Sequence, residues 1–248
     1  MNGEKIGQFI HNGNITWTMT TIGYVKYTLN LVLWLKKCVK WDLCIICCDS
    51  ESELFFRRQQ IPCVLYKKKT LDGMAAFGTP SFSVFNLYKV ELLKWFAENY
   101  ESVGYNKSLY MDGDIVVQRD PWILMDNIFG GENIAFQCDC YTDDEHFDCR
   151  TICSGLVLTR HVSKDQGRIY EYDKARWEKC GSMDQPYIAG ALGDTPFKIL
   201  ERRQFGNGTW MKRGEWKDGN WTLLHYNYLV SGSKRSAMKA NGHWLLHY

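Results

Sequence analysis

The sequence predicts an α/β fold with a mostly parallel central sheet and helices on both of its faces. In the first half of the chain, short apolar runs of strand length alternate with longer segments of helical periodicity. This alternation is typical of parallel strands, because parallel neighbours need a crossover connection, which is usually helical. The apolar runs are also nearly continuous, as in strands that are buried on both faces.

The first half contains four expected strands and two expected helices. The strands are Asn14–Thr21, Leu43–Cys48, Cys63–Lys67 and Ser108–Val117. Apolar residues at three- and four-residue spacing predict amphipathic helices at Tyr24–Cys38 and Ser81–Tyr100. In such sheets the ligand lies beyond the carboxyl ends of the strands. We therefore expect the polar residues after the first and fourth strands to face one crevice.

The second half is less regular. Strands are expected at Ile134–Cys140 and Ser154–Arg160, a helix at Lys164–Cys180, and a loop with a short helix at Ser182–Gly193. The sequence contains no internal repeat and no low-complexity linker. We therefore expect one domain over residues 1–248, made of a regular half to about residue 120 and an irregular half from 121 to 248.

The composition excludes several classes of protein. The net charge is only +2, which argues against a nucleic-acid-binding surface, and the short basic run Lys67–Lys69 is interpreted as a solvated loop. No signal peptide and no apolar run of membrane-spanning length is evident. We expect a soluble cytoplasmic protein; the alternatives are an excised domain, or a bacterial or viral enzyme acting in the cytosol. Aromatic residues make up 15% of the chain, which hints at stacking on bases or sugars.

The ten cysteines do not form a recognisable zinc motif. Cys44 and Cys47 have C-x-x-C spacing, but they belong to an expected strand, where residues three apart point to opposite faces. The remaining spacings, including those of Cys138, Cys140, Cys149 and Cys153, match no familiar zinc site. We expect free thiols in a reducing compartment.

The segment SLYMDGDIVV places two carboxylates at the end of an apolar run. In an extended segment, Asp112 and Asp114 share a face, and Gly113 lets the backbone turn or lets a ligand approach. Two carboxylates on one face repel unless a cation lies between them. Mg²⁺ or Mn²⁺ fits this arrangement, and the alternative is a surface Asp-Gly-Asp turn.

Five segments in order resemble one enzyme family. The segment LYMDGDIVVQRDP resembles the D-x-D strand of nucleotide-sugar glycosyltransferases with the GT-A fold, most closely the retaining glycogenin-like family 8 and plant xylosyltransferase-like family 77. FNLYKVELL is similar to the helix before that strand, and CSGLVLTR is similar to the N-[ST]-G strand. MDQPYIAGAL is similar to the D-Q segment, and HYNYLVSGSKRSAMKANGHW is similar to the C-terminal H-x-N…G…K segment. The chain departs from the family at Cys153, where Asn is usual, and in the spacing from His225 to Gly232 and Lys234.

The resemblance implies a role for each matching residue. His225 would be the third metal ligand beside Asp112 and Asp114, and an imidazole favours Mn²⁺ over Mg²⁺. Thr20, Thr21, Gly23 and Tyr24 would bind the nucleotide, and Lys89, Gly232 and Lys234 would contact phosphate or sugar. Ser154 and Gly155 would line the sugar pocket, and Asp184 and Gln185 would act in catalysis.

Each role has a structural alternative. His225 could be a hydrogen-bonded structural histidine, Tyr24 could cap the first helix, and Lys89 could be a solvated lysine. Asp184 and Gln185 could instead start a helix. His243 and His247 are interpreted as structural or tail residues.

The resemblance implies a metal-dependent glycosyltransferase that moves a sugar from a UDP-linked donor to a glycan, glycoprotein or other hydroxyl acceptor with retention. A metal-dependent sugar-nucleotide hydrolase or nucleotidyltransferase would use the same two aspartates. A carbohydrate-binding module would explain the aromatic content without any metal.

Overall fold

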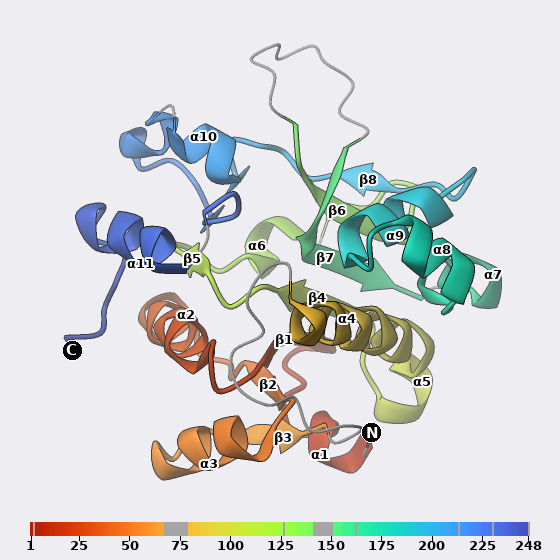
Figure 1. Cartoon of the computed structure of the whole chain (residues 1–248), viewed down its shortest axis with the longest axis horizontal. Coiled ribbons are helices and arrows are strands. Elements are labelled where there is room, and N and C mark those ends of the chain that lie inside the picture. The colour runs from red at the N-terminus through yellow and green to blue at the C-terminus, as the bar shows by residue number, and fades with distance from the viewer. Residues whose placement is uncertain are drawn as a thin grey trace.

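The computed structural model describes residues 1, 3–66, 79–125, 127–140, 151–161, 163–212, 214–229 and 231–247. A seven-stranded sheet lies at the centre, with helices on both faces, and a three-stranded sheet lies beside it (Figure 1). The basic run Lys67–Lys69 and Cys149 lie outside the described residues.

The large sheet is mostly parallel, as predicted. Its spatial order is β3 (Cys63–Leu65), β2 (Cys44–Cys47), β1 (Asn14–Thr20), β4 (Lys107–Met111), β7 (Ile152–Arg160), β6 (Ile134–Cys138) and β8 (Lys198–Ile199). Only β7 runs antiparallel to its neighbours β4 and β6; the other neighbouring pairs are parallel. The carboxyl ends of β1, β4 and β6 therefore meet at one edge.

The helices divide between the two faces of this sheet. One face is covered mainly by α2 (Val25–Cys38), α3 (Ser50–Arg58), α6 (Trp122–Met125), α10 (Gly208–Lys212) and α11 (Ser231–Ala240). The other is covered by α1 (Gly3–Gly7), α4 (Pro80–Glu98), the 3-10 helix η1 (Arg168–Tyr170), α8 (Lys174–Lys179) and α9 (Asp184–Ala191). The remaining short helices are α5 (Tyr100–Val103), α7 (Lys164–Gly167) and η2 (Glu215–Asp218).

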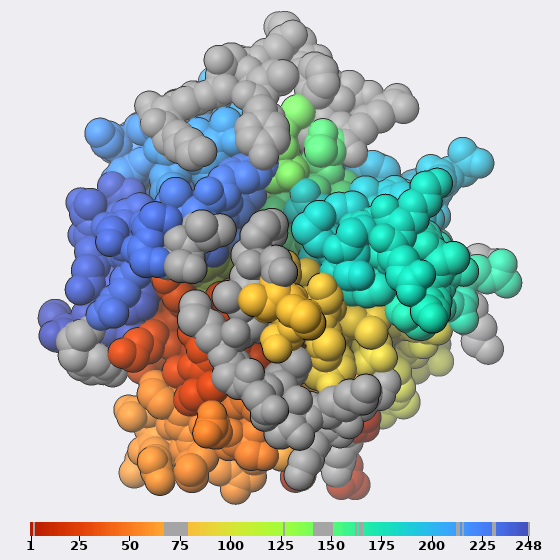
Figure 2. Space-filling model, in the orientation of Figure 1, coloured from red at the N-terminus to blue at the C-terminus, as the bar shows by residue number. Residues whose placement is uncertain are grey.

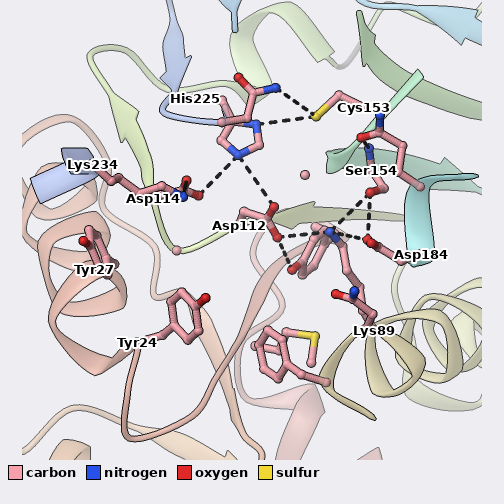
Figure 3. A pocket seen from close by; sticks show the side chains of 18 of the residues that line it. Tyr24, Tyr27, Lys89, Asp112, Asp114, Cys153, Ser154, Asp184, His225 and Lys234 are labelled. Carbon is pink, nitrogen blue, oxygen red and sulfur yellow. Dashed lines mark hydrogen bonds and ion pairs between the residues drawn. The ribbon is translucent and has the colours of Figure 1, made fainter. Parts of the chain in front are cut away.

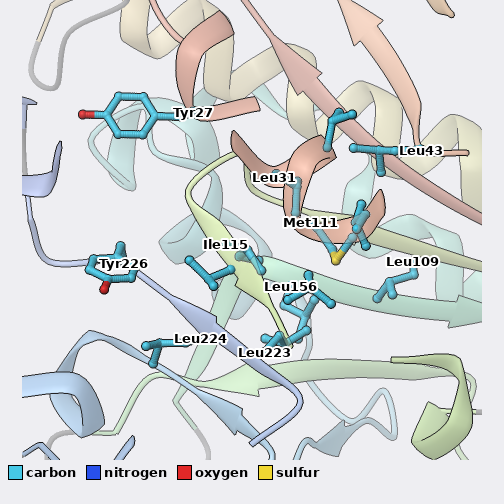
Figure 4. Close-up of a cluster of buried hydrophobic side chains, with 14 of the residues drawn as sticks. Tyr27, Leu31, Leu43, Leu109, Met111, Ile115, Leu156, Leu223, Leu224 and Tyr226 are labelled. Atoms are coloured by element: carbon cyan, nitrogen blue, oxygen red, sulfur yellow. The ribbon is translucent and has the colours of Figure 1, made fainter. Parts of the chain in front are cut away.

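The period of two along each strand assigns its residues to these faces. In β2, Ile45 and Cys47 pack into the core under α2, whereas Cys44 and Ile46 pack under α4. Figure 4 shows part of the first of these cores. Cys44 and Cys47 thus point to opposite faces, as the strand periodicity predicted.

Two helices begin with side-chain caps that the sequence supplies. Asp49 precedes α3 and accepts a hydrogen bond from the Ser52 amide at 2.6 Å, while its second oxygen accepts one from the Ile22 amide at 2.8 Å. Thr79 caps α4 by accepting from the Phe82 amide at 3.2 Å, and Pro80 occupies the first turn. Asp49 therefore also ties the loop after β1 to the start of α3.

The predicted strand Ser108–Val117 is wrong, because it divides into two strands in different sheets. β4 ends at Met111, and a turn over Asp112–Ile115 is closed by the Ile115 amide, which donates to the Asp112 carbonyl at 3.2 Å. β5 (Ile115–Val117) then pairs antiparallel with β10 (Leu223–His225), which pairs parallel with β9 (Phe205–Gly206). The two aspartates lie in this turn rather than in an extended segment.

The predicted helix Lys164–Cys180 is also interrupted. It consists of α7, η1 and α8, with an extended residue, Glu171, after η1. Asp173 accepts a hydrogen bond from the Arg176 amide at 2.6 Å, which starts a new helix and explains the break.

The expectation of free thiols holds for eight cysteines in the described part of the chain and is wrong for Cys138, which is disulfide-bonded. The free cysteines are Cys38, Cys44, Cys47, Cys48, Cys63, Cys140, Cys153 and Cys180. Among the described residues, no helix is both long and apolar enough to cross a membrane.

We predict that Trp17 is a main stabilising residue of the core. Its ring is fully buried, stacks on Phe96 at 4.2 Å and contacts Tyr110 at 4.6 Å. Trp17→Ala should lower the free energy of unfolding by about 3–5 kcal/mol, measured by urea denaturation. Leu54→Ala is the control, since Leu54 is 48% exposed and its loss should change the free energy by under about 1 kcal/mol. Equal effects of the two substitutions would contradict this assignment.

Candidate functional site

A cavity of about 420 Å³ lies at the carboxyl edge of the large sheet. Its lining comes from both halves of the chain, which also meet on the face shown in Figure 2. The turn between β4 and β5 forms one side, the first turns of α2 another, and α4, α9 and β10 the rest. A ligand in this cavity would therefore contact residues that are distant in sequence.

Two carboxylates and one imidazole converge in this cavity. Asp112 and Asp114 lie in the turn after β4, and His225 is the last residue of β10. The His225 Nε2 atom lies 3.2 Å from Asp114 Oδ1 and 3.6 Å from Asp112 Oδ2 (Figure 3). One potential ligand atom from each residue lies within 4.8 Å of the others. The strand register explains this convergence, because His225 pairs directly with Ile115, the residue after Asp114.

Gln137 fixes the orientation of the His225 ring. Its amide nitrogen donates to the carbonyls of Phe205 and Gly206 at 3.1 and 2.8 Å, so its oxygen must face the ring. That oxygen lies 2.9 Å from His225 Nδ1, which therefore carries a proton and donates. The Nε2 atom is left to face the two carboxylates. Metal-bound histidines are oriented in the same way by an acceptor on the second ring nitrogen.

The three residues fit a divalent cation. Two carboxylate oxygens and an imidazole nitrogen suit Mn²⁺, Mg²⁺ and similar ions. Cationic side chains compensate the carboxylates. Burial alone would raise the pKa of Asp114, but Lys234 and His225 outweigh it and hold that pKa well below the usual range. Burial would lower the pKa of His225, but Asp114 and Cys153 raise it to about 10.

Lys89 joins the cluster of Asp112, Asp114 and His225 to a third carboxylate. This buried lysine on α4 lies 3.2 Å from Asp112 Oδ1 and 2.8 Å from Asp184 Oδ2 (Figure 3). Burial opposes its charge, yet the two aspartates raise the pKa of Lys89 above its ordinary value. Lys89 is therefore a charged part of the site rather than a solvated helical lysine.

Asp184 starts α9, but its side chain does not serve as a cap. The N-cap of α9 is Met183, which makes no side-chain cap hydrogen bond. The Asp184 carboxylate instead accepts from Ser154 Oγ at 2.8 Å and pairs with Lys89. Burial would raise its pKa, but Lys89 and the Ser154 hydroxyl lower it. Asp184 therefore stays ionised at the cavity wall.

A second polar network surrounds Asp139, which follows β6. Gln185 donates to Asp139 Oδ2 at 2.6 Å, Asn227 donates to Oδ1 at 3.2 Å, and the Tyr228 hydroxyl also donates to Oδ1. Burial raises the pKa of Asp139, against the opposing effect of Tyr228, Gln185 and His225. The network sets the position of Gln185, whose own oxygen accepts weakly from the Ser154 amide at 3.4 Å.

Two glycines are required by close packing. A Cβ at Gly155 would lie 2.1 Å from His225 Cε1 and 2.7 Å from Asp112 Oδ2. A Cβ at Gly113 would lie 2.8 Å from the hydroxyl of Thr28 on α2. At Gly113, Thr28 of α2 occupies the space that a Cβ would need. At Gly155, the side chains of His225 and Asp112 occupy it.

Aromatic rings line another part of the cavity. Tyr24 and Phe85 are nearly parallel, with ring centroids 5.9 Å apart and an interplanar angle of 4°. Tyr27 and Phe82 lie beside them in the lining. Tyr24 is also the N-cap residue of α2, without a side-chain cap hydrogen bond, so its ring contributes to the cavity wall.

Most of the predicted site residues come together here. The cavity lining includes Tyr24, Lys89, Asp112, Gly113, Asp114, Ser154, Gly155, Asp184, Gln185, His225 and Lys234. The lining does not include Thr20, Thr21, Gly23 or Gly232. Thr20 and Thr21 are fully buried, and the Thr20 hydroxyl is bonded to Thr21 and Thr28 instead.

Several lining residues were not predicted from the sequence. They include Tyr27, Thr28, Phe82, Phe85, Asn86, Asp139, Asn227 and Tyr228. Helical periodicity could have identified five of them, because Tyr27 and Thr28 lie three and four positions after Tyr24, and the three α4 residues lie seven, four and three positions before Lys89. Asp139 could also have been identified from the sequence, since it follows a strand parallel to β4.

The predicted structural role of His243 is confirmed. His243 is buried, and its ring packs against Trp216 at 4.9 Å and Trp221 at 5.6 Å. Burial lowers its pKa to about 4.

The overall fold matches that of known glycosyltransferases, although no protein-family model and no curated protein sequence matches the chain. A glycosyltransferase involved in glycosylation of the major capsid of PBCV-1 aligns with 9% identity over 92% of this chain and 98% of its own, at a TM-score of 0.52. The galactosyltransferase LgtC, solved with donor and acceptor sugar analogues, aligns with 11% identity over 94% and 96%, at a TM-score of 0.56.

GlyE of Streptococcus pneumoniae TIGR4, also a glycosyltransferase, aligns with 16% identity over 94% of this chain and 60% of its own, at a TM-score of 0.57. The chain therefore has the GT-A fold that the sequence predicted. Identities this low establish the fold alone, and the activity must be argued from the site.

We predict that Gly155 is needed for metal binding. In Gly155→Ala the added methyl group must displace His225 or Asp112, so affinity for Mn²⁺ should fall at least about tenfold, measured by calorimetric titration. Gly190→Ala is the matched control, because a Cβ at that position meets nothing within 4 Å. The affinity of this variant for Mn²⁺ should be unchanged. If Gly155→Ala binds Mn²⁺ like the wild type, these residues do not form the metal site.

Proposed function

We propose that this protein is a metal-dependent glycosyltransferase that moves a sugar from a nucleotide-diphosphate donor to a hydroxyl acceptor. The donor is a UDP-sugar, the acceptor a glycan or glycoprotein, and the reaction proceeds with retention. The main support is the cluster of Asp112, Asp114 and His225, which opens into a cavity with aromatic rings and buried ion pairs in a GT-A fold. The proposal of UDP and of retention rests on the resemblance of the motifs.

The diphosphate would lie at the metal cluster. A divalent cation bound by Asp112, Asp114 and His225 would neutralise the leaving diphosphate. Lys234, at the start of α11, is bonded to Asp114 and can donate to a phosphate oxygen instead. The first turn of α2 contains no acidic residue, so its helix dipole also favours an anion. We propose Mn²⁺ over Mg²⁺ because one ligand is an imidazole.

The nucleoside would lie against the aromatic wall. A pyrimidine ring is flat and can pack against the exposed parts of Tyr24 and Phe85, whose planes are already parallel. Tyr24 precedes α2 and lines the same cavity as Asp112 and Asp114. The base and the diphosphate would thus occupy adjoining parts of one cavity.

The transferred sugar would lie between the metal cluster and α9. Lys89, Ser154 and Asp184 form a bonded set that faces the cavity and offers both donors and acceptors to hydroxyl groups. The ionised Asp184 would also stabilise positive charge that develops at the anomeric carbon. Gln185, held by Asp139, would lie beside the same carbon.

We predict that Asp114→Asn abolishes donor turnover while the fold is retained. Loss of a charged ligand should reduce UDP release from UDP-glucose, UDP-galactose or UDP-xylose in the presence of Mn²⁺ by at least about a hundredfold. Asp194→Asn, at an exposed site, is the matched control and should keep wild-type activity.

Undiminished turnover by Asp114→Asn would contradict the metal assignment. The products separate the proposed transfer from its alternatives. A saccharide acceptor should increase UDP release and gain a sugar, whereas a hydrolase would release free sugar at the same rate with or without the acceptor.

A further inference from the structure

One side chain in the cavity lining has a hydrogen-bonding group with no partner. Asn86 on α4 is 5% exposed, and its amide nitrogen has no hydrogen-bond partner among the described residues. Leaving a buried amide unpaired is unfavourable, and most buried polar groups in proteins are paired. The nitrogen atom itself is buried, but Asn86 also lines the cavity, so a ligand there can supply the missing partner once the amide turns toward it.

The position of Asn86 on its helix indicates which part of a ligand it would meet. Phe82, Phe85, Asn86 and Lys89 recur at helical spacing, and all four line the cavity, so they share one face of α4. Phe85 contributes the ring that is parallel to Tyr24, while Lys89 pairs with Asp112 and Asp184. This face of α4 therefore changes from apolar to charged, and Asn86 lies one turn before the charged end.

Lys89 belongs to the set of side chains that would surround the transferred sugar. Its ammonium group lies 2.8 Å from Asp184 and 3.5 Å from the Ser154 hydroxyl. Side chains three apart on a helix are neighbours, so the Asn86 amide is adjacent to that set. A rotation of the amide about its terminal torsion can present either the nitrogen or the oxygen to the cavity.

We propose that Asn86 is a specificity-determining residue that recognises a free hydroxyl group on the transferred sugar. A hydroxyl group both accepts and donates, so it can satisfy either atom of the amide. The donor class is then a nucleotide sugar with an unmodified hydroxyl at the position that faces α4. This inference rests on the proposed function and adds to it a contact that distinguishes a sugar nucleotide from the nucleotide alone.

The test compares UDP with UDP-sugars in the wild type and in Asn86→Leu. Calorimetric titrations with Mn²⁺ would use UDP, UDP-glucose, UDP-galactose, UDP-xylose and UDP-N-acetylglucosamine. At least one donor should bind the wild type more tightly than UDP does. Asn86→Leu should weaken that donor about tenfold and leave the affinity for UDP unchanged.

Two further measurements exclude a merely structural effect. Leucine has a similar size and removes the unpaired amide, so the melting temperature of Asn86→Leu should equal or exceed that of the wild type. Phe85→Leu is the matched control on the same helix face, and it should weaken UDP and the UDP-sugar by the same factor.

The outcomes separate this inference from the proposed function. The inference is overturned if no UDP-sugar binds more tightly than UDP, if Asn86→Leu binds the donor like the wild type, or if it weakens UDP equally. Absence of Mn²⁺-dependent binding of both UDP and GDP by the wild type would overturn the proposed function itself, before any variant is compared.

Discussion

The site depends on one constraint: the turn after β4 holds two carboxylates close together, and positive charge must compensate them. Asp112 and Asp114 belong to a single turn that Ile115 closes, so they cannot separate without breaking it. Their partners are Lys89, Lys234 and His225, which come from three different elements. A divalent cation would take over part of this role and release lysine side chains toward an anionic ligand.

The second sheet places the histidine. Without the turn at Gly113, the segment from Ser108 to Val117 would continue as one strand, and β5 would not diverge to pair with β10. That pairing aligns His225 with Ile115 and brings its ring to the carboxylates. Gln137 then fixes the ring from behind, because two backbone carbonyls determine its own orientation. The position of the His225 ring is thus determined by the pairing of β5 with β10 and by the buried Gln137 amide, more than by contacts among Asp112, Asp114 and His225.

The fold and much of the site were predictable from the sequence because their signals are local. Apolar runs and helical periodicity identified β1, β2, α2 and α4, and the D-x-D spacing identified the two carboxylates of the site. The rest depends on tertiary contacts. The break after Met111 and the position of His225 follow from strand pairing across more than a hundred residues, which local patterns do not contain. Gln137 and Asp139 acquire their roles from partners elsewhere in the chain, and Cys138 could not be distinguished from the unpaired cysteines.

The central claim is that the carboxylate pair and His225 bind a metal ion that in turn binds a nucleotide diphosphate. Isothermal calorimetry of the purified protein with UDP and with GDP, each with and without Mn²⁺, tests it most directly. The account predicts micromolar UDP binding that requires Mn²⁺. Mn²⁺-dependent binding of GDP alone would keep the class of enzyme and change the donor. Binding of neither nucleotide, with or without Mn²⁺, would contradict the account and leave Asp112 and Asp114 as parts of a structural turn.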